Sequence, residues 1–425
     1  CFVYLTGSVT ATYCTSDTNT TILQRIPQAF GGNYPTTAAG PGSVALLTGE
    51  LQLDQTDLAI STPLSGMTVS RTHRSFAAGD NTNTANNGFG PGWSASFEAG
   101  GVGLTGSQVW DTTATDGHLT IASSSGDTLS FAVPGTIQTD PVGTYTAEGD
   151  AATTSSMQAN VSGTSSNLTL TVTEPNGTVS VWTKNVNDMQ GWKPVSVTEA
   201  GNHHKTTYTV NGAGQVTQIL APQAAGVTCQ SMQPGCAALN IIYATTTSGG
   251  DVAGQIKQIS YTAYDPTSHN MVTTPQVGYS YNSNKQLATV TNLLTNRVTG
   301  YGHDTTTQTR LTSLTPPGLA GFHYQYNASG QLQTVTRDTT LTGTPVTVET
   351  FVYNLPVTSP PTGFPQPLAV DTLLQTDTPI YGAAVFGADH TPTGVTAAAL
   401  TATDAHYAHL YYVDTNGNTV NTVNP

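Results

Sequence analysis

Charge is scarce in this chain. Asp, Glu, Lys and Arg make up 8% of its 425 residues, and 11 Lys and Arg stand against 25 Asp and Glu, for a net charge of −14. A nucleic-acid-binding protein needs a basic surface to displace counterions from phosphates, and an anionic membrane surface attracts the same basic residues. The composition excludes both as main partners. It leaves a surface of uncharged polar side chains, which is typical of secreted β-proteins.

Helical periodicity and long apolar runs are also rare. Apolar residues seldom recur at helical spacing, and 43 Gly and 24 Pro interrupt the chain. No segment approaches the roughly 18 consecutive apolar residues of a membrane-spanning helix. Short β-branched and aromatic runs predict strands instead, at 169–172, 179–182, 205–210, 239–243 and 351–353.

Turn residues separate these runs. Asn176-Gly177 is a hairpin turn that joins 168–173 to 178–183, and Asp116-Gly117 and Gly126-Asp127 suggest further hairpins. The sequence therefore predicts an all-β fold of stacked or wrapped hairpins.

The four cysteines form two local pairs. Cys1 and Cys14 bracket the N-terminal arm, and Cys229 and Cys236 bracket a short loop with Pro and Gly. No His lies at metal-ligand spacing from them, so we expect two disulfides and an oxidising compartment; free thiols or a metal site are the alternatives.

A repeated phrase is the most informative feature. It occupies residues 208–219, 279–290 and 324–335, with a partial copy at 254–259, and reads Tyr-x-apolar-Asn, two turn residues, Gly or Lys, Gln, aliphatic, two polar residues, aliphatic. Its aromatic positions form the expected core of the repeat: Tyr208, Tyr279, Tyr281, Tyr324 and Tyr326. Its turn residues are Asn211, Gly214, Asn282, Asn327 and Gly330.

The phrase has a physical interpretation as one hairpin. Tyr residues two apart share one face of a strand, the Asn begins a turn, and the Gly or Lys closes it. The aliphatic residues of the return strand are three apart instead of two, which indicates a bulge or a strand end. One hairpin cannot bury its own aromatic face, so successive hairpins must stack or wrap.

The phrase resembles the YD repeat of RHS proteins, in which Tyr-x-Tyr-Asp precedes Gly-x-Leu. Segments 51–74 and 88–93, the latter reading Gly-Phe-Gly-Pro-Gly-Trp, are similar to the entry segment of long secreted actinobacterial-type RHS proteins, and 411–425 is similar to a later segment. The resemblance implies a β-sheet that spirals into a hollow shell, which in many members encloses a toxin or effector. It divides the chain into an arm (1–42), a β-rich entry domain (43–180) and a YD-repeat sheet forming part of a shell (181–425). The repeat Asp of the family is Asn here.

Candidate sites outside the repeat have simple structural interpretations. His406 and His409 have metal-like spacing on a helix, but their aromatic neighbours favour a strand, where they would point apart. His203-His204 reads as a turn. Segment 80–88 is rich in oxygen ligands but has no closing carboxylate for calcium. We therefore expect no metal and no cofactor.

The aromatic residues Trp93 and Trp192 lie near Gly and could stack on a glycan, but core packing is the default expectation for both. No nucleophile elbow, phosphate loop or zinc-protease motif occurs, and carboxylates are few, so we expect no enzyme.

Three functional hypotheses remain. The first is a secreted or cell-surface structural protein, part of an RHS-type shell or surface assembly. The second is the containment portion of a polymorphic toxin whose effector lies beyond Pro425. The third is a carbohydrate-binding or adhesive module. Expected partners are further copies of the chain or the remainder of a longer one.

Overall fold

Antiparallel hairpins account for nearly all of the chain that the computed structural model describes. The described residues are 34–76, 88–95, 97, 118–122, 128–132, 142–148, 157–164, 167–185, 192–305, 310–341, 343–366, 378–414 and 418–425. Within them, the only helical elements are two 3-10 turns, η4 (Ala397–Ala399) and η5 (Asp404–His406). The predicted all-β class is confirmed.

A small sheet, called here the entry sheet, comes first. Its strands pair in chain order: β1 (Thr36–Ala39), β2 (Gly42–Ala45), β3 (Leu51–Ser61), β4 (Gly66–Arg74) and β5 (Trp93–Ala95). It contains the segments that resemble an RHS entry region.

The rest of the chain forms the hairpin sheet, in which each strand pairs with the next from β6 to β26. Its first strands are β6 (His118–Ala122), β7 (Thr128–Ala132), β8 (Gly143–Glu148), β9 (Gln158–Thr164), β10 (Asn167–Thr173), β11 (Val179–Lys184) and β12 (Lys193–Thr198). Then follow β13 (Lys205–Val210), β14 (Val216–Leu220), β15 (Ala237–Tyr243), β16 (Ile256–Asp265), β17 (Asn270–Tyr281), β18 (Leu287–Asn292) and β19 (Arg297–His303). The last are β20 (Leu311–Thr315), β21 (Phe322–Tyr326), β22 (Leu332–Asp338), β23 (Pro345–Leu355), β24 (Tyr381–Phe386), β25 (His409–Val413) and β26 (Thr419–Val423). The predicted domain boundary at residue 180 lies inside β11, and pairing continues across it.

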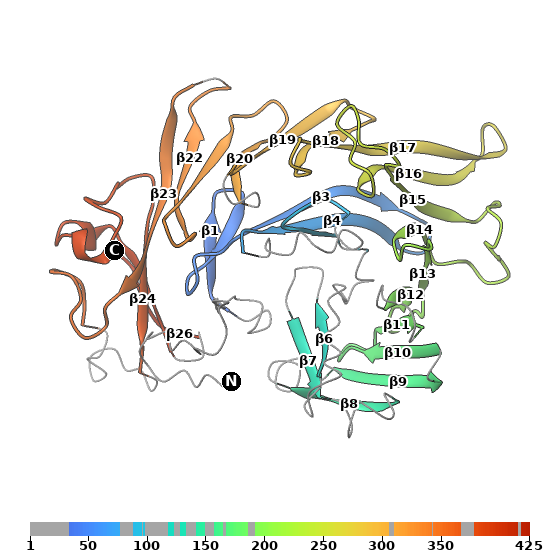
Figure 1. Cartoon of the computed structure of the whole chain (residues 1–425), viewed down its shortest axis with the longest axis horizontal. Coiled ribbons are helices and arrows are strands. Elements are labelled where there is room, and N and C mark those ends of the chain that lie inside the picture. The colour runs from blue at the N-terminus through green and yellow to red at the C-terminus, as the bar shows by residue number, and fades with distance from the viewer. Residues whose placement is uncertain are drawn as a thin grey trace, which may run out of the picture.

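The hairpin sheet curves into an arch, and the entry sheet lies on its concave side (Figure 1). One hydrophobic core joins the two. Leu53 and Val69 of the entry sheet pack in the same cluster as Ile259, Leu287 and Val335 of the hairpin sheet. The entry sheet thus covers the aromatic and aliphatic face that the isolated hairpins would expose.

A β-bulge follows each Asn turn of the repeat. The register of β17 with β18 shifts between Ser280 and Tyr281, which leaves Ala288 as the extra residue. Because of it, Leu287 and Val290, three positions apart, both face the core. The hairpins β13–β14, β19–β20 and β21–β22 shift at the same point. This is the bulge that the aliphatic spacing predicts.

Two further cores complete the sheet. One lies between strands β6 to β12 and contains Trp182 and Trp192. The other covers the second face of β23 to β25: Phe351 belongs to the core shared with the entry sheet, while its neighbour Val352 belongs to this outer cluster. Alternate residues point to opposite faces, so these strands are buried on both sides.

The long connection between β24 and β25 is pinned over the outer cluster by one buried carboxylate. Asp404, which is fully buried, accepts hydrogen bonds from Nε2 of His390 (2.7 Å) and from the backbone N–H and hydroxyl of Thr401 (2.7 Å each). Burial would raise the pKa of Asp404, but these donors outweigh it and hold the pKa well below its usual value. His406 ends the 3-10 turn η5 and His409 begins β25, so the expectation that both lie on one strand is wrong.

Close packing of the two sheets leads to a prediction at Gly49, in the turn between β2 and β3. Its φ is 74°, and an added Cβ would lie 2.4 Å from Cβ of Gln331 on the hairpin sheet. Gly201 has a similar φ of 78° but nothing within 4 Å. We expect Gly201→Ala to cost about 1–2 kcal/mol through backbone strain alone. Gly49→Ala should cost a further ~1–3 kcal/mol through the steric overlap. Denaturant unfolding of both variants checks this, and equal losses would contradict it.

Candidate functional site

Each Asn turn is closed by the side chain of its Asn. Oδ1 of Asn211 accepts the backbone N–H groups of Ala213 (2.9 Å) and Gln215 (3.0 Å), and its Nδ2 donates to Oε1 of Gln215 (3.0 Å). The same bonds recur at Asn282 and Asn327. The residue before each Gln has a left-handed φ, at Gly214 (81°), Lys285 (63°) and Gly330 (82°). Gly takes this conformation without strain, whereas Lys285 must be held there by the turn.

A ladder of aromatic donors connects successive hairpins. The last aromatic residue before a turn donates a hydrogen bond to the backbone carbonyl of the first return-strand residue in the preceding hairpin. The pairs are Tyr243 with Val216 (3.0 Å), Tyr281 with Ile256 (2.6 Å), His303 with Leu287 (2.8 Å), Tyr326 with Leu311 (2.9 Å) and Tyr353 with Leu332 (2.7 Å). Each acceptor lies at the shifted register, where the strand pairing is interrupted. The aromatic side chains therefore satisfy carbonyls that the bulges leave unpaired.

A second ladder runs the other way through the Gln side chains. Nε2 of Gln215 donates to the carbonyl of Gly254 (2.9 Å), and Nε2 of Gln255 donates to the carbonyl of Lys285 (2.9 Å). At Gln331 the acceptor is the carbonyl of Thr48, in the entry sheet (3.3 Å). The partial copy of the repeat at 254–259 is thus a full member of the ladder.

The entry sheet docks onto the same turns through its own carbonyls. The carbonyl of Gly88 accepts the N–H of Ile256 (2.8 Å) and the hydroxyl of Tyr281 (3.0 Å). The carbonyl of Gly49 accepts the N–H of Leu332 (2.8 Å). Both carbonyls meet the first residue of a return strand, so the entry sheet is anchored to the repeat itself.

A buried ion pair lies at the centre of the contact between the sheets. Arg71 of β4 is 1% exposed, and its Nε and Nη2 donate to the carboxylate of Asp57 on β3 at 2.7 and 2.9 Å. Nη2 also donates to the hydroxyl of Tyr301 (2.6 Å), while the hydroxyl of Tyr279 donates to Asp57 (3.0 Å). The guanidinium carbon lies 4.3 Å from the ring centre of Trp93. The carboxylate, the hydroxyl groups and the aromatic ring faces from both sheets therefore offset the cost of burying the Arg71 charge away from water.

The pKa values of this cluster favour its charged pair. Burial lowers the pKa of Arg71, but the Asp57 carboxylate and the neighbouring tyrosines outweigh burial and raise it above its usual value. Burial and the negative charge of Asp57 also raise the pKa of Tyr279 well above its usual value, so that its hydroxyl stays protonated as a donor. The arrangement joins the two sheets.

The tyrosines predicted as the repeat core lie at this interface. Tyr279, Tyr281 and Tyr324 are buried, and Tyr208 and Tyr326 are partly buried against the same core. Burial raises the pKa of Tyr208 to about 12.

Trp93 and Trp192 pack in cores, which is the default expectation for them, and do not form the possible glycan contacts. Their side chains are 5% and 7% exposed, within the two inner cores. Trp93 packs edge-on against His73 and Tyr301, at ring distances of 5.0 and 5.3 Å. Neither indole offers a free face to a sugar.

The remaining candidates are placed as follows. Cys229 and Cys236 form a disulfide with a Cα–Cα distance of 5.7 Å, whereas Cys1, Cys14 and the 80–87 part of the oxygen-rich loop lie outside the described residues. In the part of the chain that the structure describes, no three His, Cys, Asp or Glu side chains gather as a metal site would require. No helix there is long and apolar enough to cross a membrane.

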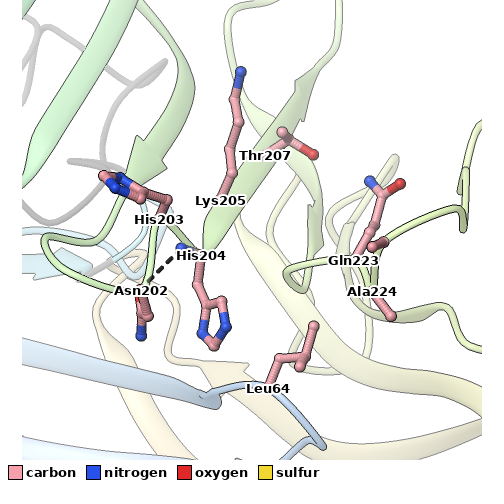
Figure 2. A pocket seen from close by; sticks show the side chains of 9 residues that line it. Leu64, Asn202, His203, His204, Lys205, Thr207, Gln223 and Ala224 are labelled. Atoms are coloured by element: carbon pink, nitrogen blue, oxygen red, sulfur yellow. Dashed lines mark hydrogen bonds between the residues drawn. The ribbon is translucent and has the colours of Figure 1, made fainter.

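His203-His204 lies in a turn, with a φ of 57° at His203. It borders a pocket of about 530 Å³ that Leu64 and Gln223 also line. Figure 2 shows His203, His204 and Lys205 projecting in different directions. These polar groups do not converge on one point, so the pocket is not built like a ligand site.

The sequence prediction did not include several residues of the aromatic ladder and of the buried ion pair. Residues 301–304 read Tyr-Gly-His-Asp and 351–354 read Phe-Val-Tyr-Asn, and both carry the aromatic and Asx positions of the repeat. The signal for His303 and Tyr353 was therefore present. Asp57 and Arg71 gave a weaker signal: they are charges on strands of a chain with few charges.

A family model described as a domain of unknown function, DUF6531, matches residues 42–130, which include the entry sheet. None of the curated proteins matches the chain. A crystal structure of TcdB2–TccC3–Cdc42 is similar over 89% of this chain, with 10% identity and a TM-score of 0.19. The chain spans 23% of the length of that protein.

The aromatic ladder makes a prediction about Tyr281. Tyr281→Phe keeps the ring but leaves the carbonyls of Ile256 and Gly88 without their hydroxyl donor. We expect a loss of about 1–3 kcal/mol in the free energy of unfolding. The control is Tyr264→Phe, since Tyr264 bonds only the exposed His269 among the interactions described; it should change stability by less than ~0.5 kcal/mol. Equal effects of the two substitutions would refute the ladder.

The buried ion pair makes a second prediction. Asp57→Ala leaves the Arg71 guanidinium buried without its counter-charge, and should cost about 3–5 kcal/mol. Asp251→Ala is the control, because Asp251 pairs with Lys257 at 3.5 Å where both side chains are at least 33% exposed; it should cost ~0–1 kcal/mol. Unfolding by urea, an uncharged denaturant that does not screen ion pairs, measures the loss in both variants. A loss at Asp57 no larger than that at Asp251 would show that the pair does not hold the sheets.

Proposed function

We propose that the chain is a non-catalytic structural segment of an RHS-type β-shell in a secreted or cell-surface protein. The observation that carries this proposal is the use of the repeat tyrosines. Tyr281, Tyr326 and Tyr353 donate to backbone carbonyls, and Tyr279 donates to Asp57. The buried polar groups of the repeat thus serve to connect hairpins and sheets.

Two further features support a protein outside the cytosol. The Cys229–Cys236 disulfide fits an oxidising compartment, and the surface is low in charge and rich in Thr, Ser, Asn and Gln. The partners that we propose are other parts of a longer RHS chain or further copies of this one.

A containment role is a second candidate, favoured by the last hairpin. In the return strands β18 and β22, two aliphatic residues three apart are buried. The corresponding positions in β26 are Thr419 and Thr422, and both are exposed. In this last hairpin, the face that β18 and β22 bury is therefore polar. A wall of that kind fits a water-filled interior that holds another domain. The adhesive alternative loses support because Trp93 and Trp192 are buried.

The product of the entire parent gene tests both candidates by electron microscopy. A structural shell predicts a hollow β-walled particle in which this segment forms part of the wall. Containment predicts, in addition, density inside the particle and a reading frame that continues past Pro425 into further repeats and a separate C-terminal domain. A solid or open particle would contradict the shell, and an empty shell without such a domain would contradict containment alone.

A further inference from the structure

Two histidines face each other where the entry sheet meets the hairpin sheet. His73 of β4 is fully buried, and His303 of β19 lies with its ring centre 6.5 Å away. His73 also packs edge-on against Trp93 at 5.0 Å, so the pair belongs to the cluster around Arg71. Neither sheet contains the pair by itself; it exists only while the entry sheet is docked.

The surroundings of His303 accept a neutral ring only. Its Nε2 lies 2.8 Å from the carbonyl of Leu287, and a carbonyl can only accept, so Nε2 carries the proton. Its Nδ1 is buried and has no hydrogen-bond partner among the described residues. Protonation would therefore place a charged N–H where nothing accepts it, which is unfavourable in a dry interior.

The carboxylate that bonds Arg71 within the cluster is already engaged. Asp57 is already paired with Arg71, and Nη1 of Arg71 itself has no described partner. The other titratable groups around the pair are Tyr279 and Tyr281 of β17, Tyr301 of β19, Tyr324 and Tyr326 of β21, Glu349 of β23, and Asp304 and Arg310 in the turn after His303. Burial raises the pKa of Tyr279, Tyr301, Tyr324 and Tyr326, which favours their neutral form. Glu349 is engaged with the backbone N–H of Gly40 at 2.7 Å.

We propose that His73 and His303 form an acid-sensitive lock between the entry sheet and the hairpin sheet. At neutral pH the His303 ring is uncharged and the sheets stay docked. On acidification, a proton on His303 adds a positive charge against the ring of His73, in the cluster that already holds Arg71, and the entry sheet loosens from the concave face. The lock goes beyond the structural role proposed above and does not depend on what the shell holds.

The direction of the pKa shift agrees with this geometry. Burial lowers the pKa of His303, and the hydrogen bond to Leu287 only partly opposes it. The docked state therefore binds fewer protons than the undocked state. Docking free energy is complete above the ordinary His pKa of about 6.5, and falls as the pH drops from that value toward the lowered pKa.

Hydrogen exchange of the whole chain as a function of pH tests the lock, with exchange rates corrected for their intrinsic pH dependence. Amides of β3 and β4 should lose protection by about tenfold per unit of pKa difference between pH ~7 and ~5. Amides of β10 and β11, whose core residues belong to the separate cluster around Trp182, should keep their protection. Unchanged protection of β3 and β4 in the native protein would overturn the proposal without any variant.

Variants identify the groups responsible. The double variant His73→Gln, His303→Gln cannot be protonated, and a Gln amide at 303 can still donate to the Leu287 carbonyl; the acid loss should disappear. His406→Gln is the matched control, because His406 is exposed on η5 and far in sequence from the interface, and it should keep the acid response of the native protein. The same acid loss in the double variant would assign the effect to other groups and refute the lock.

Discussion

Each hairpin of the repeat leaves one backbone carbonyl that its own strands do not satisfy, and much of the structure is arranged around that need. The bulge after the turn creates the unpaired carbonyl, and it also turns two aliphatic residues three apart onto the core side. The next hairpin supplies an aromatic hydroxyl or imidazole to that carbonyl. The bulge, the aliphatic spacing and the aromatic residue are therefore one device that makes each hairpin dependent on its successor.

The entry sheet uses the same device from the concave side. Its Gly49 and Gly88 carbonyls accept N–H groups at the start of return strands, and the Gly88 carbonyl shares the Tyr281 hydroxyl with Ile256. Two repeat tyrosines that face inward, Tyr279 and Tyr301, bond Asp57 and Arg71 in place of a carbonyl. The repeat thus connects hairpin to hairpin along the sheet and sheet to sheet across the core, with the same residue type.

The sequence predicts the class of fold because the deciding signals are local. Turn residues, alternating apolar residues and the repeated phrase all lie within about a dozen residues of each other, which covers one hairpin. The interface is different. Arg71 meets Tyr301 across 230 positions, and no local pattern indicates that partner. For the same reason the glycines beside Trp93 do not indicate which residues bury it, and the docked sheets supply them.

The choice of Asn in the turns follows from the second ladder. Because Nε2 of Gln215 donates to the carbonyl of Gly254, the side-chain oxygen Oε1 of Gln215 faces Asn211. That oxygen can only accept a hydrogen bond, so the turn residue must supply a donor, which is Nδ2 of Asn211. An ionised Asp could not offer that donor, and would draw the Gln amide back into the turn and away from the next hairpin. The last hairpin shows the converse: Asp414 stands opposite Asn418, whose N–H and Nδ2 both donate to the carboxylate at 2.9 and 3.3 Å. The Asn turns with their Gln partners therefore link hairpins without charge, which is one reason that a sheet of this size contains so few ionised residues.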